Sequence, residues 1–173
     1  AIHDKKKEQI FLARDRVGIK PLYYLQIGEK FVFSSEIKSI LKYKSFNKSV
    51  NQNALGRYLQ FRYTTTEETF FSNIKKFPPG HYAIIKNGSM KKKRFWNIQK
   101  TQNYENKNKS YYFEKFSYLI EDSVKKRLVS DVPFGMYLSG GIDSTVILSI
   151  MNKYLKDKIN TYSVDFNPPI GEG

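Results

Sequence analysis

The stretch DVPFGMYLSGGIDS, residues 131–144, decides the fold of the second half of the chain. The apolar segment Phe134 to Leu138 follows Pro133 and predicts a buried strand. Residues 159–166 predict a second strand. Between them, a small-residue loop leads into a helix with the apolar positions Val146, Ile147, Ile150, Met151 and Tyr154. The order strand, loop, helix, strand is typical of a parallel α/β sheet.

The loop between strand and helix has the chemistry of a phosphate site. Ligands of an open α/β sheet bind beyond the carboxyl ends of its strands, where this loop is expected. Gly140 and Gly141 let a phosphate approach backbone N–H groups, and the N-terminus of the helix adds donors and a partial positive charge. Ser139 and Ser144 offer hydroxyl donors. Asp143 would repel phosphates unless Mg²⁺ bridged them, so the sequence predicts a magnesium-bound polyphosphate.

A structural alternative accounts for the same loop. In a plain glycine-rich turn, Asp143 or Ser144 would only cap the helix. The loop lacks the lysine of a P-loop NTPase and the glycine spacing of a dinucleotide fold, so neither of those sites fits. The apolar strand before the loop and the long helix after it favour nucleotide binding.

A polar stretch upstream predicts a domain boundary. Residues 99–110 carry almost nothing to bury, and we expect a linker there. After it, apolar residues at three- and four-residue steps predict a helix of about five turns. Its stripe consists of Phe113, Phe116, Ile120, Val124 and Leu128.

The first segment of the chain predicts a β-meander with two helices. We expect a turn at 14–18 with Gly18 at positive φ, and a two-residue hairpin turn at Asn87-Gly88. One helix is expected to begin at Ser34-Ser35-Glu36 with a serine cap and a carboxylate in its first turn, and to bury Ile37, Ile40 and Leu41. A second is expected over 51–62, with Leu55, Tyr58 and Leu59 on one side. The strands are expected at 9–13, 22–25, 31–33 and 81–85.

Composition bounds the function. The chain has 173 residues, 40% apolar and 16% aromatic, which is enough to bury a core. Its net charge of +14 lies in residues 1–109, which hold 23 basic and 8 acidic side chains. Of the 30 basic residues 24 are lysine, and the runs 5–7 and 91–94 are expected in solvated turns, so a nucleic-acid partner is disfavoured. Cysteine is absent, and no membrane span or secretory signal is visible, so we expect a cytoplasmic protein.

Several blocks in family order resemble the glutamine-hydrolysing asparagine synthetases. Residues 131–144 are similar to the pyrophosphate loop of that family. Residues 14–24, 33–41, 77–82 and 94–96 are similar to the end of its glutaminase domain. The resemblance implies an internal fragment of mixed α/β class. Residues 1–105 would be the C-terminal part of an N-terminal-nucleophile αββα glutaminase domain, an α+β fold. Residues 106–173 would begin a Rossmann-like adenine-nucleotide α-hydrolase (PP-loop) domain with a parallel sheet.

The resemblance also implies a reaction and its ligands. Glutamine would be hydrolysed to ammonia, and aspartate would react with ATP to give β-aspartyl-AMP and pyrophosphate before ammonia displaces AMP. No catalytic residue is expected in this segment, because the family's nucleophilic cysteine would lie upstream. Asp143 would hold Mg²⁺, and a homodimer is compatible with the family. The residues implied at the nucleotide are Tyr137, Leu138, Ser139, Gly140, Gly141, Asp143, Ser144 and Val164.

Two other functions remain open on the sequence. A related amidotransferase or cyclase would adenylate another carboxylate, such as a sugar acid or a peptide, and the residues that recognise the acyl substrate lie outside this sequence. A basic RNA-binding or RNA-modifying protein with the same loop is the alternative from another class. It would require binding to RNA that survives physiological salt.

Overall fold

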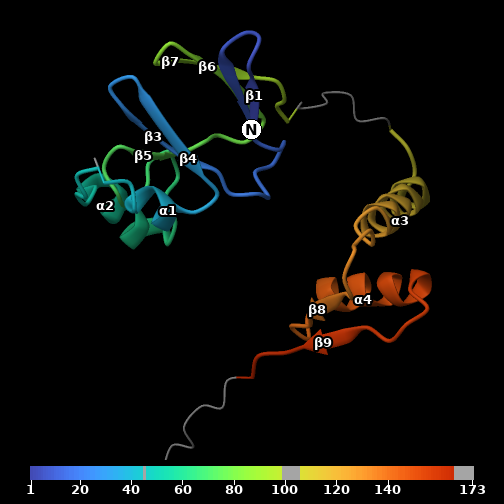
Figure 1. Ribbon diagram of the computed structural model, residues 1–173. Helices are drawn as coiled ribbons and strands as arrows, with labels where there is room; N and C mark the ends of the chain where they lie inside the picture. The colour runs from blue at the N-terminus through green and yellow to red at the C-terminus, as the bar shows by residue number, and fades with distance from the viewer. Residues whose placement is uncertain (45, 99–105, 166–173) are drawn as a thin grey trace, which may run out of the picture. The chain divides into compact units, whose positions relative to one another are not determined.

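The computed structural model describes residues 1–44, 46–98 and 106–165. The chain packs as two compact units, residues 1–100 and 101–173 (Figure 1). The boundary expected after residue 105 and most of the expected linker lie outside the described residues. No helix in the described ranges combines the length and the apolar character that a membrane crossing requires.

Unit 1 is built on two antiparallel sheets. One sheet has the strand order β1-β2-β6-β7 and the other has the order β4-β3-β5. The first consists of β1 (Ile2–Asp4), β2 (Gln9–Ala13), β6 (His81–Lys86) and β7 (Ser89–Arg94). The second consists of β3 (Tyr23–Ile27), β4 (Lys30–Ser34) and β5 (Ile74–Lys76).

The two sheets bury one core between them. Leu12, Ala83 and Ile85 from the first sheet pack with Tyr24 from the second and with Phe77. Phe77 is 0% exposed, and its ring meets the Tyr24 ring edge-on with centroids 6.0 Å apart. Alternation along each strand places these side chains on the inner faces. The strand expected at 9–13 is present with those bounds, and the other three are present with ends that differ by at most two residues, whereas β5 was not expected.

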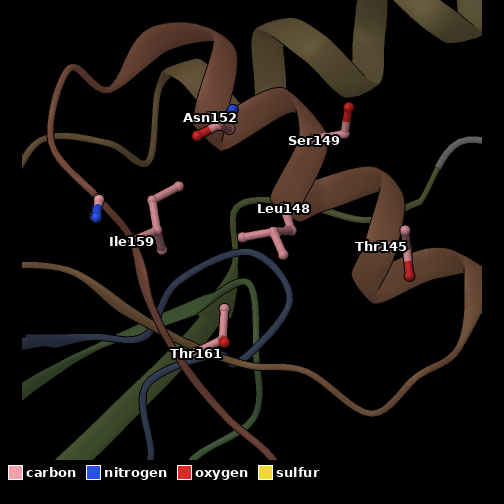
Figure 2. A pocket seen from close by; sticks show the side chains of 7 residues that line it. Thr145, Leu148, Ser149, Asn152, Ile159 and Thr161 are labelled. Atoms are coloured by element: carbon pink, nitrogen blue, oxygen red, sulfur yellow. The ribbon is translucent and has the colours of Figure 1, made fainter.

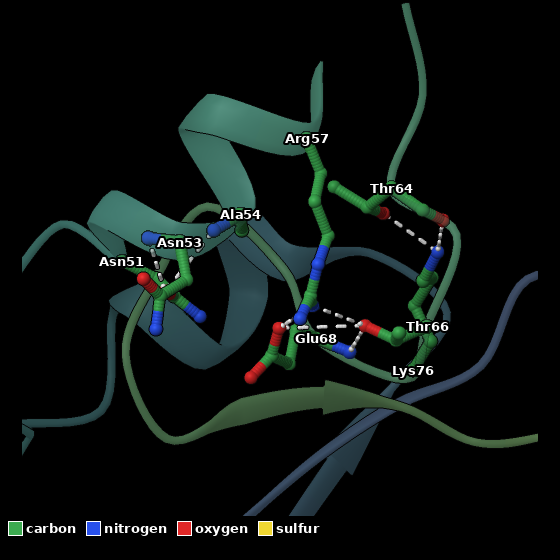
Figure 3. Close-up of polar contacts among 8 residues, drawn as sticks. All are labelled: Asn51, Asn53, Ala54, Arg57, Thr64, Thr66, Glu68 and Lys76. Carbon is green, nitrogen blue, oxygen red and sulfur yellow. Dashed lines mark hydrogen bonds and ion pairs between the residues drawn. The ribbon is translucent and has the colours of Figure 1, made fainter. Parts of the chain in front are cut away.

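Helices cover the outer face of the second sheet. Helix α1 (Ile37–Leu41) contributes Ile40 to a second core with Leu25 and Ile74. Helix α2 (Gln52–Phe61) is capped by Asn51, whose side-chain oxygen accepts from the N–H groups of residues 53 and 54 (Figure 3). Unit 1 therefore has the layer order sheet, sheet, helix, which agrees with the mixed α/β class expected. The αββα fold that the resemblance implies stays a prediction.

Two details of these helices differ from expectation. Ser34 does not cap α1: its hydroxyl accepts from the N–H of Glu36, which is itself the N-cap, so no carboxylate lies in the first turn. The buried residue of α2 is Ala54, whereas Leu55 and Leu59 are 37% and 75% exposed. The small side chain of Ala54 lets the helix backbone approach the residues packed against it, whereas Leu55 and Leu59 lie on more exposed parts of the helix surface.

The turn after β2 is held by Asp15. Gly18 has φ +72°, as expected for this turn, and its N–H donates to the Asp15 carbonyl. The Asp15 carboxylate accepts from the N–H groups of Lys20 (3.0 Å) and Ile19 (2.9 Å). These bonds stabilise the charged form and lower the pKa of Asp15 below its usual value.

Acid is expected to weaken unit 1 through Asp15. Because the folded-state pKa is depressed, the contribution of Asp15 is present above its unfolded pKa and is lost as pH falls through the folded value. Urea unfolding of wild type and Asp15→Ala, measured from pH ~6 to below ~4, should give curves that converge in acid. Asp157→Ala removes an exposed carboxylate that makes no hydrogen bond among the described residues, and it should follow wild type. A constant gap between wild type and Asp15→Ala would contradict the assignment.

Unit 2 consists of two helices and a parallel strand pair. Helix α3 (Lys109–Lys125) packs on α4 (Ile142–Tyr154), and β8 (Gly135–Tyr137) pairs with β9 (Asn160–Tyr162). The Glu121 carboxylate accepts from Lys153 Nζ at 2.6 Å and from the Tyr154 hydroxyl, which joins the helices. The parallel pairing confirms the expected strand, helix and strand order.

Several expectations for unit 2 are wrong in detail. Helix α3 begins at Lys109, inside the expected linker, and ends before Leu128. The strand expected to be buried is largely exposed: Tyr137 is 81% exposed and only Met136 of β8 is partly covered. The reason is that β8 has one strand neighbour among the described residues, so its side chains lack the packing of a central strand.

The lysine run at 91–94 is also not a turn. It lies in β7, paired with β6, whereas residues 5–7 do form a turn. Lys92 lies on the same face of β7 as Met90, which packs against the core, and its Nζ pairs with Glu67 at 2.6 Å. Lys91 and Lys93 alternate to the other face.

Candidate nucleotide-phosphate site

The carboxyl ends of β8 and β9 meet at one edge of unit 2. The N–H of Leu138 donates to the carbonyl of Tyr162 at 2.8 Å, and the hydroxyl of Ser163 donates to the carbonyl of Leu138 at 2.7 Å. Val164 lies two residues beyond β9 and is 72% exposed. The structure therefore brings Leu138, the following loop and Val164 to the same edge, where open α/β sheets bind ligands.

The two glycines leave space over the loop backbone. Gly140 has φ +76°, and a Cβ built on it would meet nothing within 4 Å. Gly141 has an ordinary φ of −79° and is the N-cap of α4. A Cβ on Gly141 would meet only the Ser139 hydroxyl, at 3.4 Å. The approach to these backbone groups is open.

Hydroxyls gather around the same turn. The Ser139 and Ser144 oxygens lie 3.2 Å apart, and the Ser139 oxygen accepts from the N–H of Gly141 at 3.4 Å. The hydroxyls of Ser144 and Thr145 donate to the carbonyl of Gly141 at 3.0 and 2.9 Å. The same carbonyl also accepts the intrahelical bond from the N–H of Thr145 at 3.1 Å. As at the start of any α-helix, the first N–H groups of α4 have no intrahelical partners.

No side chain caps α4. The N-cap is Gly141, which has no side chain to accept from the first helix N–H groups, and Ser144 donates to a carbonyl instead of accepting from a helix N–H. Asp143 lies in the first turn, and its carboxylate makes no hydrogen bond or ion pair among the described residues. The capping alternative for these two side chains therefore does not describe this loop.

A single carboxylate is compatible with magnesium at this loop. The described residues contain no group of three or more His, Cys, Asp or Glu side chains placed to hold a metal ion. Magnesium bound with a nucleotide takes one or two carboxylates and completes its shell with phosphate oxygens and water. Asp143, with its unused oxygens, fits that pattern, whereas a metal site formed by protein ligands alone would not.

An aromatic pair borders the loop. Tyr137 and Tyr162 are register partners on the two strands, with ring centroids 6.3 Å apart, and are 81% and 55% exposed. A Cβ on Gly135 would lie 2.9 Å from the Tyr162 ring, so a larger residue there would displace that ring. Tyr162 was not among the residues predicted at this site, since only the strand register shows that it is paired with Tyr137.

The larger hollow of unit 2 is a separate feature. A cavity of about 490 Å³ lies between α4 and the segment leading into β9, and Leu148 and Ile159 form its apolar middle (Figure 2). Thr145 is the one lining residue next to the glycine loop. The cavity is thus beside the loop and does not contain Ser139 to Ser144.

Comparisons with known proteins agree with the order of the two units. Residues 1–96 match the family described as glutamine amidotransferase domain, and residues 115–172 match the family described as asparagine synthase. The chain is 33% identical over 171 residues to glutamine-hydrolyzing asparagine synthetase 3 of Bacillus subtilis, covering 96% of this chain and 28% of the relative. It is 36% identical over 177 residues to asparagine synthetase 2 of the same organism, covering 95% and 23%.

A fungal relative has a different name. The chain is 30% identical over 157 residues to amidase chry2 of Gibberella zeae, covering 88% of this chain and 23% of the relative. The chain therefore spans about a quarter of the length of these curated relatives. With an amidotransferase segment followed by a synthase segment, and with this identity across both, the chain belongs to the family of glutamine-hydrolysing asparagine synthetases.

Proposed function

We propose that this chain is part of an ATP-dependent, glutamine-hydrolysing amide ligase that converts aspartate to asparagine. In the proposed reaction the aspartate β-carboxylate attacks the α-phosphorus of ATP, and pyrophosphate leaves. Ammonia released from glutamine then attacks the β-carbonyl carbon of β-aspartyl-AMP, and AMP leaves. The observation that carries the proposal is the open glycine turn at the carboxyl end of β8, following an amidotransferase segment.

The loop would act by holding the charge of the leaving pyrophosphate. The N–H groups at Gly140, Gly141 and the first turn of α4 would donate to phosphate oxygens, aided by the partial positive charge of the helix N-terminus. The hydroxyls of Ser139 and Ser144 lie beside that position and can reorient toward it. Asp143 would hold Mg²⁺, which when bound neutralises phosphate charge. This is electrostatic stabilisation of a leaving group by preorganised donors.

The adenosine would lie along the strand ends. Both backbone groups of Leu138 are taken, by Tyr162 and Ser163, whereas the backbone of Val164 makes no hydrogen bond among the described residues. Val164 is therefore the residue whose backbone would read the adenine edge. Leu138 and Tyr137 would supply apolar contact beside it.

A second candidate is a related enzyme that amidates a different carboxylate. The observation that favours it is that a relative with a name other than asparagine synthetase aligns with 88% of the chain. Both candidates use the nucleotide loop in the same way, so assays of aspartate against other carboxylic acids separate them.

Substitution of Gly141 tests the phosphate role of the loop. Gly141→Ala introduces no positive-φ strain and no clash with protein atoms, so melting of the chain should be unchanged. The new methyl group would obstruct phosphate, and MgATP affinity should fall at least ~10-fold, equivalent to about 1.4 kcal/mol. The measurement is nucleotide titration with melting followed in parallel.

Gly140→Ala is the matched comparison. Its φ of +76° strains any other residue, so this variant should lose stability by about 1–2 kcal/mol. If Gly141→Ala kept full affinity while losing stability, the loop would be a structural turn and the proposed function would lose its main support.

A further inference from the structure

Unit 1 contains a cavity that the proposed reaction does not use. Its volume is about 420 Å³, and its wall includes Arg14, Lys76 and the three consecutive threonines 64–66. Tyr63, Pro78 and Pro79 form an apolar part of the wall. The cavity lies wholly within unit 1, so its interpretation does not depend on the glycine loop of unit 2.

Arg14 presents a fixed guanidinium to this cavity. Its Nε donates to the carbonyl of Lys20 at 2.8 Å, and its Nη2 donates to that of Gly18 at 2.9 Å. Its Nη1 donates to the carbonyl of Phe77 at 2.6 Å. Three of the five N–H donors of an arginine are thus used, and two remain. Among the described residues no carboxylate pairs with Arg14, so its charge is held in place by dipoles and is not neutralised.

Lys76 is a second cation without a carboxylate. Its Nζ donates to the backbone carbonyl and the hydroxyl oxygen of Thr64, both at 2.7 Å, which leaves one N–H (Figure 3). Burial, and then the nearby charge of Arg14, lower the pKa of Lys76. Two partly buried positive charges therefore face one cavity and disfavour each other.

The one carboxylate in the wall is already occupied. The oxygens of Glu67 accept from Lys92 Nζ at 2.6 and 2.7 Å and from the Tyr24 hydroxyl at 3.4 Å. Burial, together with Glu67, raises the pKa of Tyr24 to about 12, which keeps that hydroxyl a donor to Glu67. The charge of Glu67 is therefore balanced by Lys92, and Glu67 does not neutralise Arg14 or Lys76.

The remaining polar side chains of the wall are the three threonines. The Thr64 oxygen accepts from Lys76, so its proton is free to donate, and the Thr65 hydroxyl makes no hydrogen bond among the described residues. Thr66 is fixed by Arg57 at 3.2 Å, and Arg57 also pairs with Glu68 (Figure 3). The cavity therefore combines two cations, two free hydroxyls and an apolar side.

We propose that this cavity binds the carboxylate of a small organic acid. The planar fork of Arg14 and the single open N–H of Lys76 match two carboxylate oxygens. The apolar wall of Tyr63, Pro78 and Pro79 suits a short carbon chain better than the all-polar shell of a phosphate. Bound carboxylate would balance the two cations that the fold leaves facing each other.

The test is titration of the 173-residue chain with L-glutamate, its dimethyl ester and inorganic phosphate, followed by calorimetry. Saturable glutamate binding is expected, with the ester and phosphate at least ~10-fold weaker. Lys76→Met should lower glutamate affinity at least ~10-fold, or about 1.4 kcal/mol. Lys75→Met is the matched control, because Lys75 is the exposed neighbour on β5 and lies outside the cavity wall, and it should bind as wild type.

A second variant separates a loss of binding from a loss of folding. Lys76→Met also removes the anchor of Thr64, so Thr65→Val, which loses only an unbonded hydroxyl, should weaken glutamate about 3-fold without changing the melting temperature. Equal losses in Lys75→Met and Lys76→Met would show diffuse charge and overturn the proposal. Phosphate binding tighter than glutamate, or no saturable binding of glutamate, would overturn it as well.

Discussion

Asp143→Asn is expected to abolish ATP–pyrophosphate exchange in an enzyme that joins this sequence to the rest of both domains, while glutamine hydrolysis continues. Asparagine keeps the size of the side chain but removes the charge that would hold Mg²⁺ against the phosphates. Groups that stabilise developing charge at such a site are worth about 10²–10³ in rate, so exchange should fall at least ~100-fold. The two half-reactions are assayed separately on the same preparation.

Asp157→Asn is the control for this result. It removes an equal charge from an exposed position of the same unit, away from the loop, and exchange should stay near wild type. If Asp143→Asn retained normal exchange, Asp143 would have no role with the metal, and its unpaired state in the first turn of α4 would need another explanation.

Phe77→Ala is expected to cause the largest loss of stability in unit 1. The ring is 0% exposed between the two sheets, and it meets Tyr24, Leu12 and Ala83 in one cluster. Truncation leaves a cavity in a site framed by strands on both sides, so unfolding free energy should fall by about 3–5 kcal/mol. Urea unfolding, followed by the fluorescence of Trp96, measures the change.

Phe95→Ala separates burial from the loss of an aromatic ring as such. Phe95 is 51% exposed, and its substitution should cost well under 1 kcal/mol, or about the effect of a typical surface change. Similar losses for the two variants would mean that Phe77 does not centre the core of unit 1.

The features that could be predicted are those formed by residues close together in the sequence. The Asn87-Gly88 turn joins β6 to β7 as expected. Its two residues have φ +49° and +69°, values that favour asparagine and glycine. The strand, glycine loop and helix around Ser139 are likewise short-range features, and their order is confirmed. Whether the loop residues bind nucleotide stays a prediction.

Features set by distant partners could not be predicted. Lys92 looks solvated in sequence, but its ammonium pairs with Glu67, 25 residues away, and this partner could not be predicted. The three-residue strand β5 has no periodicity to detect, and only its pairing with β3 defines it. The Tyr137 and Tyr162 pair depends on strand register, and the donors left open on Arg14 depend on carbonyls from two separate segments.

The lysine-rich strand β7 also affects how two copies of the chain can meet. β7 is an outer strand, so the peptide groups on its free side have no strand partner among the described residues. Such an edge is a template for edge-to-edge aggregation. Here it carries Lys91, Lys93 and Arg94, and a second copy pairing along it would place like charges at the ~5 Å spacing of adjacent strands. The positive charge of β7 thus disfavours extension of the sheet by β7 of a second copy.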